Sequence, residues 1–485
     1  ILANKTYMIN LSKLSIAALF LVLATISLAG CQTLTAPSSP SEMWKSPAKK
    51  YPDTSWETIR KQKIDASKPL TLTDLVNLAL QNNPSTRQTW NSARAAQAVR
   101  AQSESALYPS AKITGSLTRE DVRANMSMAN QDDLDLNGKI KLTYLLLDFG
   151  GRSADIAQTS ALLLSANFQF NQSIQDLLLN TENAYYGLYS AKAALEAAQA
   201  DLENARTSYD AADTRFKAQL ASKLDVLQAK SNYENSLFAL EGAKGQVKTS
   251  KAKLAQTIGA TADTEFEISD PDRPLPTELS ENDVTKLIND AMEQRPDIAA
   301  RRASVEARKA AIRSADSALY PTINANAAAE GNRYKYYDRS KDMDDDRTYS
   351  AYLSFDWDLF DGFNNLSKRR QAEMEAEVER AKLVEDQLAA SADVWTKYYN
   401  FKTAIRQYGF GESLLETATT SYDLALESYN NGLRSMLDLI NAQSQLSDAR
   451  SKLIQTKKDL FLSLADLAHA TGSLYAGDIA NEQSK

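Results

Sequence analysis

The sequence contains very few residues that bind metals or carry out acid–base and thiol chemistry. Among 485 residues there is one cysteine, Cys31, and one histidine, His469. A lone cysteine excludes an internal disulfide framework, and a lone histidine leaves no cluster for a metal centre. His469 falls in helical sequence, where a surface or packing role is the simpler expectation. We therefore predict no cofactor, no metal site and no enzymatic activity.

The chain lacks an excess of basic charge, since 62 acidic residues against 55 basic ones give a formal net charge of −7. Nucleic-acid binding needs basic surface that neutralises phosphates, so we expect no nucleic-acid partner. Gly150 and Gly151 follow a predicted strand but lack the spacing of a phosphate-binding loop. No cluster of methionine and histidine indicates a copper or silver cargo.

Proline is missing from two long stretches of the chain. All twelve prolines lie at or before Pro321, and residues 110–270 and 322–485 contain none. Proline breaks helix interiors and central strands, so these stretches are free to form long uninterrupted elements. Each of them opens with strand-like sequence and then becomes helical.

Long apolar runs are limited to one leader. Lys13 precedes a mostly apolar run from Leu14 to Leu28, and small residues then lead to Cys31. This is the layout of a secretory signal, and the run is too short for a comfortable membrane-spanning helix. We predict that residues 1–30 are a lipoprotein signal and that Cys31 is the acylation point, the alternative being a stray thiol behind an ordinary cleavage site. Gln32 favours delivery to the outer membrane.

Most of the remaining chain consists of two similar repeats, at an offset of about 212 residues. The tetrapeptide Ala106–Pro109 returns as Ala318–Pro321, and residues 207–210 return as 420–423. A duplicated chain of this kind favours one pseudo-symmetric unit. The prediction is an N-terminal linker (31–70), a first repeat (71–264), an inter-repeat linker (265–282), a second repeat (283–472) and a short tail (473–485).

Each repeat contains two segments in which apolar residues alternate with polar ones. The clearest are Ile140–Leu146 and Tyr349–Leu359, with weaker partners at Ala111–Arg119 and Thr322–Ala329. Period-two alternation over about ten residues is typical of a transmembrane β-strand, apolar toward lipid and polar toward a lumen. A soluble hairpin with one buried face is the alternative.

The charged segments between paired strands, Glu120–Asn137 and Arg333–Arg347, are expected to be hydrated loops. Asp342, Asp344 and Asp346 have the spacing that opens a calcium loop, but arginine and leucine stand where that loop needs glycine and glutamate. We therefore do not predict a calcium site.

Helical sequence with a seven-residue period follows the strands. In the first repeat, residues 226, 233, 240, 247 and 254 are large and the residues three positions later are small. Residues 439, 446, 453, 460 and 467 repeat the pattern. A sustained heptad of this type predicts closely packed, left-handed coiled coils, with turns near 219–223 and 432–435. A soluble helical bundle is the alternative that heptads alone leave open.

The strand count indicates an oligomer. Two strands per repeat give four per chain, whereas single-chain outer-membrane barrels begin at about eight strands. Open strand edges cannot face lipid. Two chains would give a filled barrel of eight strands, and three would give twelve and leave a passage. A symmetric trimer fits a conduit best.

In these features the chain resembles the TolC-type outer-membrane efflux proteins. The matching pieces are the paired Asn83-Pro84 and Arg295-Pro296 helices, the strand-to-helix junctions at 147–152 and 359–362, and the tip sequence 429–438. The resemblance implies a mainly α-helical protomer with a membrane β-barrel. Three protomers would form a twelve-stranded barrel on a periplasmic α-helical barrel. Residues 41–70, 265–282 and the tail after Gly472 would form an equatorial layer.

The resemblance also implies a gate where the coiled coils converge at the periplasmic tip. Carried over by position, Tyr429 and Arg434 would form the latch to the first repeat, with Asp225 as an acceptor. Asp438 would lie in an acidic ring at the constriction. Where the family prototype has a second acidic ring, this chain has Asn441, so cations should be held less strongly. A plain solvated coiled-coil tip is the alternative for these residues.

Two classes of function are left. The first is a passive exit duct of a tripartite efflux pump or type I secretion system. It would be lipid-anchored in the outer membrane, extend into the periplasm, and work with a periplasmic adaptor and an inner-membrane transporter. The second is a lipid-anchored coiled-coil scaffold or tether without a pore, which would not need strands with a lipid-facing alternation. The cargo stays open between drugs, metals and secreted proteins.

Overall fold

In the computed structural model, residues 68–122, 131–271, 284–336 and 344–474 are described. The signal segment and Cys31 lie outside these ranges, so the lipid anchor stays a prediction. The first repeat contains α3 (Leu72–Asn82), α4 (Pro84–Glu104), a 3-10 turn (Ser105–Leu107), β1 (Ser110–Val122), β2 (Gln131–Leu147), α5 (Gly151–Lys217) and α6 (Lys223–Thr257). The second contains α7 (Val284–Gln294), α8 (Pro296–Ser317), β3 (Thr322–Tyr336), β4 (Asp344–Asp356), α9 (Asn364–Asn430) and α10 (Met436–Ala470).

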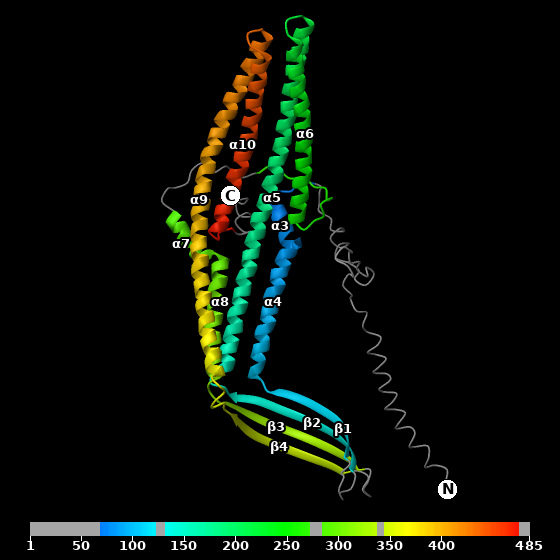
Figure 1. Cartoon of the computed structure of the whole chain (residues 1–485), viewed down its shortest axis with the longest axis vertical. Helices are drawn as coiled ribbons and strands as arrows, with labels where there is room; N and C mark the ends of the chain where they lie inside the picture. Colours follow the sequence, from blue (N-terminus) through cyan, green and yellow to red (C-terminus); the bar gives the residue numbers. More distant parts are fainter. Residues whose placement is uncertain (1–67, 123–130, 272–283, 337–343, 475–485) are drawn as a thin grey trace, which may run out of the picture. The chain divides into compact units, whose positions relative to one another are not determined.

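The two repeats have the same order of helices and strands, as Figure 1 shows. Each contributes one hairpin of strands and one very long helix, α5 or α9, of 67 residues. At 1.5 Å per residue such a helix extends about 100 Å. The predicted mainly helical protomer with four strands is confirmed.

Two shorter helices stack end to end along each long helix. Both α4 and α6 pack on α5, and both α8 and α10 pack on α9. The Asn83 side-chain amide, at the start of α4, donates to the carbonyl of Thr257, the last residue of α6, at 2.8 Å. In the second repeat the Arg295 guanidinium donates to the Ala470 carbonyl at 3.1 Å. These bonds satisfy a helix-terminal carbonyl that would otherwise lack a partner.

A glycine with a left-handed backbone closes each of these junctions. Gly259 and Gly472 both have φ +76°. A Cβ at Gly259 would lie 2.8 Å from backbone atoms of Asn82, and one at Gly472 would lie 2.9 Å from the backbone nitrogen of Arg295. Only glycine therefore fits both the conformation and the space.

The four strands form one antiparallel sheet in the order β1-β2-β3-β4. Its register aligns Ile113, Ile140, Ala329 and Tyr349 in one row. The neighbouring row, on the opposite face, contains Thr114, Lys139, Glu330 and Thr348. The first of these faces, called here the apolar face, is open to solvent in the protomer, where Ile113 and Tyr349 are each 77% exposed. The predicted alternation is confirmed.

The strands differ from the prediction in length. Segments expected as loops, 120–137 and 333–347, are partly strand, because β1 ends at Val122, β2 begins at Gln131, β3 ends at Tyr336 and β4 begins at Asp344. Ladder hydrogen bonds continue beyond the apolar part, and cross-strand charges such as Arg333 and Asp345, 2.7 Å apart, support the extension. β4 also ends earlier than expected, at Asp356 rather than Leu359. Asp342 lies outside the described residues.

The coiled-coil cores follow the predicted heptads. The buried members of the two heptad series are Val226, Ala229, Leu240, Leu254, Leu439, Ala442, Leu446, Ala449, Leu460, Leu467 and Ala470, and the other members are half-buried. Tyr209 and Tyr422 belong to the same tip-side cluster as Val226 and Leu439. Throughout the described ranges, no helix combines the length and apolarity needed to cross a membrane.

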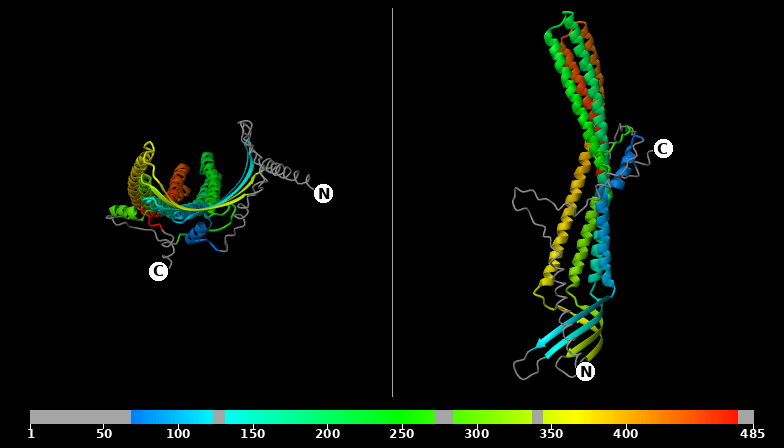
Figure 2. Two further views of the ribbon diagram at one scale, coloured as in Figure 1. Left: turned by 90° about the horizontal axis from the view of Figure 1, so that it is seen from below. Right: turned by 90° about the vertical axis from the view of Figure 1, so that its right-hand side faces the viewer.

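The predicted equatorial segments meet in part. Leu70 forms a parallel bridge with Ile268, and the Leu70 amide donates to the Glu267 carbonyl at 2.8 Å. The N-terminal and inter-repeat linkers are therefore joined at this point. In Figure 2, α3 and α7 lie on the same side of the long helices. Residues 41–67, 272–282 and 475–485 of the predicted layer lie outside the described residues.

We predict that Gly472→Ala destabilises the protein and that Gly245→Ala does not. Alanine at φ +76° costs about 1–2 kcal/mol, and the contact with Arg295 adds to that cost. Gly245 lies inside α6 with open space around it, so alanine there should be neutral or stabilising by up to about 1 kcal/mol. Thermal unfolding followed by far-UV circular dichroism measures both. Equal midpoints for the two variants would contradict the close-packed junction.

Candidate functional site at the helical tips

The residues predicted to form a gate lie at two equivalent turns, between α5 and α6 and between α9 and α10. Gln219 and Gly432 are repeat equivalents, and both have positive φ, 61° and 76°. The Leu220 amide then donates to the Arg215 carbonyl, and the Leu433 amide to the Ser428 carbonyl, each at 2.8 Å. The two tips are therefore the same turn, built with glutamine in one repeat and glycine in the other.

Asp225 and Asp438 both belong to capping boxes. The Asp225 amide donates to the Ser222 hydroxyl at 3.2 Å, and the Ser222 amide donates back to the Asp225 carboxylate at 3.0 Å. Ser435 and Asp438 form the same reciprocal pair. The Ser435 side-chain and backbone hydrogen bonds, with a smaller contribution from the charge of Arg434, lower the pKa of the exposed Asp438. Both carboxylates therefore cap the N-terminus of a helix at the tip, α6 or α10, in addition to any role in a pore.

Tyr429 is buried at the tip, 3% exposed, and a first-repeat arginine covers its ring. The guanidinium carbon of Arg215 lies 5.2 Å from the ring centroid. Arg215 also donates to the carbonyl of Asn430 at 2.7 Å. This cation–π contact and hydrogen bond join the end of α5 to the end of α9. Sequence reasoning missed Arg215, since no pattern singles out one arginine on a long polar helix.

The predicted latch residues are close together but not bonded to one another within the protomer. In the described part of the chain the Tyr429 hydroxyl has no hydrogen-bond partner. Burial raises its pKa, the charge of Asp225 raises it further, and Arg215 opposes both. Arg434 is exposed, and its resolved interaction among the described residues is with the charge of Asp438. The latch therefore stays a prediction, and the contact that the protomer makes at this point is Arg215 with Tyr429.

A polar network ties the two coiled coils together below the tips. Arg450 and Ser447 of α10 both bond the carboxylate of Asp201 on α5, Ser447 at 2.6 Å. One turn nearer the tip, the Gln443 side chain accepts from Asn232 of α6 at 2.9 Å. The network lies between hydrophobic layers, where hydrogen bonds to charged groups are strong. It connects α10 to both helices of the other repeat.

A second group of charges lies where the shorter helices meet. Arg295 donates to Asp297 at 2.8 Å and to Asp393 of α9 at 3.0 Å. Burial alone would lower the pKa of Arg295 and raise that of Asp297, but their mutual hydrogen bonds and charges outweigh it. The pKa of Arg295 is raised and that of Asp297 is lowered. Nearby, His469 of α10 pairs with Asp176 of α5 at 2.8 Å.

Within the described ranges, no three histidine, cysteine, aspartate or glutamate side chains are arranged so that they could hold a metal ion. The charged groups at the tips and below them are bonded instead to backbone, to hydroxyls or to arginine. They are suited to holding helices together and to shaping the charge of a passage.

The Outer membrane efflux protein family matches this chain in two blocks, residues 75–260 and 287–473. The chain belongs to the outer membrane efflux protein family. The predicted resemblance and the predicted class of function are thereby confirmed, and the two matched blocks each contain one of the hairpins described above.

Among members of this family, Protein CyaE of Bordetella pertussis is 27% identical over 339 residues, 69% of this chain and 70% of CyaE. The Toluene efflux pump outer membrane protein TtgF of Pseudomonas putida is 29% identical over 260 residues, 53% of each chain. The chain thus spans about half the length of TtgF. The outer-membrane channel OprN shares the fold, with a TM-score of 0.72, 19% identity and coverage of 84% of this chain and 90% of OprN.

We predict that Asp201 and Arg450 are energetically coupled across the two repeats. In a double-mutant cycle with alanine at each position, the coupling free energy should reach about 1 kcal/mol or more, as for half-buried residues in one network. The exposed pair Asp213 and Lys217 on α5 is the control, with an expected coupling of about 0.3–0.5 kcal/mol. Denaturant unfolding measures both cycles. A coupling no larger than the control would show that the network does not hold the repeats together.

Proposed function

We propose that three copies of this chain form a passive exit duct through the outer membrane. The observation that carries the proposal is a four-stranded sheet with one exposed apolar face and two unpaired edges, β1 and β4. Unpaired backbone groups are costly in lipid, so β4 of one copy would pair with β1 of the next. Three copies supply twelve strands, enough to leave a polar passage. The long helices would continue that passage into the periplasm.

A lipid-anchored tether would have no use for this sheet. Its apolar face includes Ile113, Tyr349 and Leu353, each more than 65% exposed in the protomer. Apolar area of this extent is unfavourable in water and favourable in lipid. Membership of the efflux family supports the duct as well.

The duct would act with other proteins that supply energy. We propose a periplasmic adaptor at the helical tips and an inner-membrane transporter beneath it, in an efflux pump such as the one for which TtgF is named or in a type I secretion system. Acylation at Cys31 would anchor each copy on the periplasmic side of the outer membrane. The chain itself would perform no catalysis.

The tips would be the gate. Tyr429 and Arg434 would latch α9 and α10 to the first repeat near Asp225, and three Asp438 carboxylates would line the constriction. Arg215 supports this proposal because it already holds the Tyr429 ring and the end of α9. Opening would require the tip of the second repeat to leave Arg215 and, further along, to loosen the Asp201–Arg450 pair.

Planar-bilayer conductance of the purified full chain, with its oligomeric and intact masses, tests the proposal. We expect a trimer, a chain mass increased by lipid, and small, mostly closed openings that become larger in Arg215→Ala. A chain that never conducts, even with Arg215 and Tyr429 replaced, would favour the tether. An unmodified Cys31 in protein purified from membranes would contradict the proposed lipid anchor.

We predict that Asp438→Ala abolishes cation selectivity and block by multivalent cations. Within the protomer Ser435 lowers the pKa of Asp438. Asp438 is therefore ionised at neutral pH, so selectivity should be present there and lost in acid as the carboxylates take up protons. Asp448→Ala is the matched control, since this exposed aspartate lies on another side of α10. Reversal potentials in a salt gradient report both. Unchanged selectivity in Asp438→Ala would exclude this residue from the constriction.

A further inference from the structure

A groove of small side chains runs along β3 on the apolar face. Its floor, Ala325, Ala327, Ala329 and Gly331, is called here the β3 groove. Larger side chains of β2 and β4 flank most of it, in the register rows Tyr144–Ala325–Leu353, Leu142–Ala327–Ala351 and Ile140–Ala329–Tyr349. The alanines of the floor are half-buried, whereas Leu353 and Tyr349 are 69% and 77% exposed.

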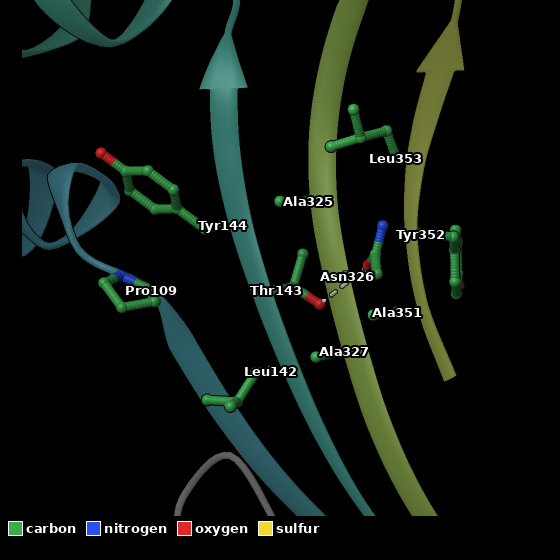
Figure 3. Close-up of a pocket in the computed structure, with 10 residues that line it drawn as sticks. All are labelled: Pro109, Leu142, Thr143, Tyr144, Ala325, Asn326, Ala327, Ala351, Tyr352 and Leu353. Carbon is green, nitrogen blue, oxygen red and sulfur yellow. Dashed lines mark hydrogen bonds between the residues drawn. The ribbon is translucent and has the colours of Figure 1, made fainter. Parts of the chain in front are cut away.

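A shallow, open hollow of about 660 Å³ lies along the groove around Ala325, Ala327 and Ala351. In Figure 3, Ala325 and Ala327 lie between the larger side chains of β2 and Leu353 of β4. The size is within the range of ligand sites, roughly 300–1,000 Å³. Thr143, Asn326 and Tyr352 also border the hollow but belong to the opposite face of the sheet. The lining side chains of the apolar face are hydrocarbon or aromatic, so the hollow suits an apolar chain.

Arginines end the groove on the side away from the helices. Gly115, Gly138, Gly331 and Arg347 form one row of the register, and Arg333 and Asp345 lie in the next. Arg333 is paired with Asp345 at 2.7 Å, whereas Arg347 is exposed and, among the described residues, interacts with Asp345 through its charge but not through a hydrogen bond or ion pair. Because the three glycines of this row have no side chains, there is room beside the Arg347 guanidinium.

The two faces of the sheet differ in charge at this level. Arg333, Arg347 and Asp345 are on the apolar face, where the two arginines outnumber the one carboxylate, and Asp135 and Asp346 are on the opposite face. An anion that approaches the apolar face therefore meets a net positive charge, while the carboxylates on the other side would line a lumen. This sidedness is charge complementarity toward an anionic group in the surrounding membrane.

The arginines also lie at the height expected of a membrane surface. Arg347 is ten residues from Trp357, which is half-exposed just beyond β4, so the two are about 33 Å apart along the strand direction. With a strand tilt of about 40°, the height between them is about 25 Å, the thickness of the apolar band of such barrels. Exposed aromatic residues cluster at the Trp357 end, including Tyr320, Phe355, Phe360 and Phe363.

We propose that the β3 groove binds a phosphate-bearing lipid of the outer leaflet. One acyl chain lies over Ala325, Ala327 and Ala329, and the phosphate is held by Arg347 with help from Arg333. Guanidinium is well suited to phosphate because it donates two parallel hydrogen bonds. The inference rests on the proposed function, since it requires the apolar face to lie in the membrane.

Titration of the purified full-length trimer with diphosphorylated lipid A, followed by native mass spectrometry, tests the site. The double variant Arg333→Gln/Arg347→Gln should bind at least about tenfold more weakly, the loss expected for charge-assisted hydrogen bonds. Ala327→Phe, which fills the groove and keeps both arginines, should weaken binding to a similar degree. Lys112→Gln/Lys141→Gln removes two positive charges from the opposite face and should bind as the unmodified chain does.

Unchanged binding in the arginine double variant would overturn the proposal, as would equal binding of lipid A without its phosphates. An equal loss in the lysine control would show a general effect of charge and would overturn it too. Inorganic phosphate at the same concentration should not displace the lipid, because the acyl chain contributes to binding. Conductance of each variant trimer separates this inference from the proposed function. Trimers that conduct but do not select this lipid contradict only the site, and chains that neither insert nor conduct contradict the function.

Discussion

The structure depends on the joint at which one helix ends against the start of another. Each long helix, α5 or α9, is covered by two shorter helices that must meet without leaving carbonyls unpaired or a gap in the core. Asn83 and Arg295 supply the missing donors, and Gly259 and Gly472 let the backbones approach. On one side of the joint, α6 and α10 form coiled coils with the long helices. On the other side, α4 and α8 lead to the strands of the sheet.

The second repeat uses the joint for more than capping. Where the first repeat has the neutral Asn83, the second has Arg295, which also reaches Asp393 on α9. Through the Arg295 bond to the Ala470 carbonyl, the pair of His469 with Asp176 and the pair of Arg450 with Asp201, α10 is bonded to α8 and at two levels to α5. If the tips open as proposed, these polar contacts would be the ones to break.

The sheet follows a different constraint, that of register. Alternation fixes which side chains share a face, but pairing decides which of them become neighbours. The alanines of β3 line up with larger side chains on β2 and β4, and three glycines line up with Arg347. A face that is simply apolar in sequence thus gains a groove with a charged end.

The sequence by itself determined the duplication, the two strands per repeat, the heptad cores and the position of the tips, because each is a local periodicity or a repeated turn. It placed the ends of the strands poorly, since the charged parts of both hairpins continue the ladder without an apolar signal. Only the tertiary structure joined Arg215 to Tyr429, or Arg450 to Asp201 at a separation of 249 residues. Such contacts depend on how two coiled coils pack side by side, and no periodicity within either repeat specifies that packing.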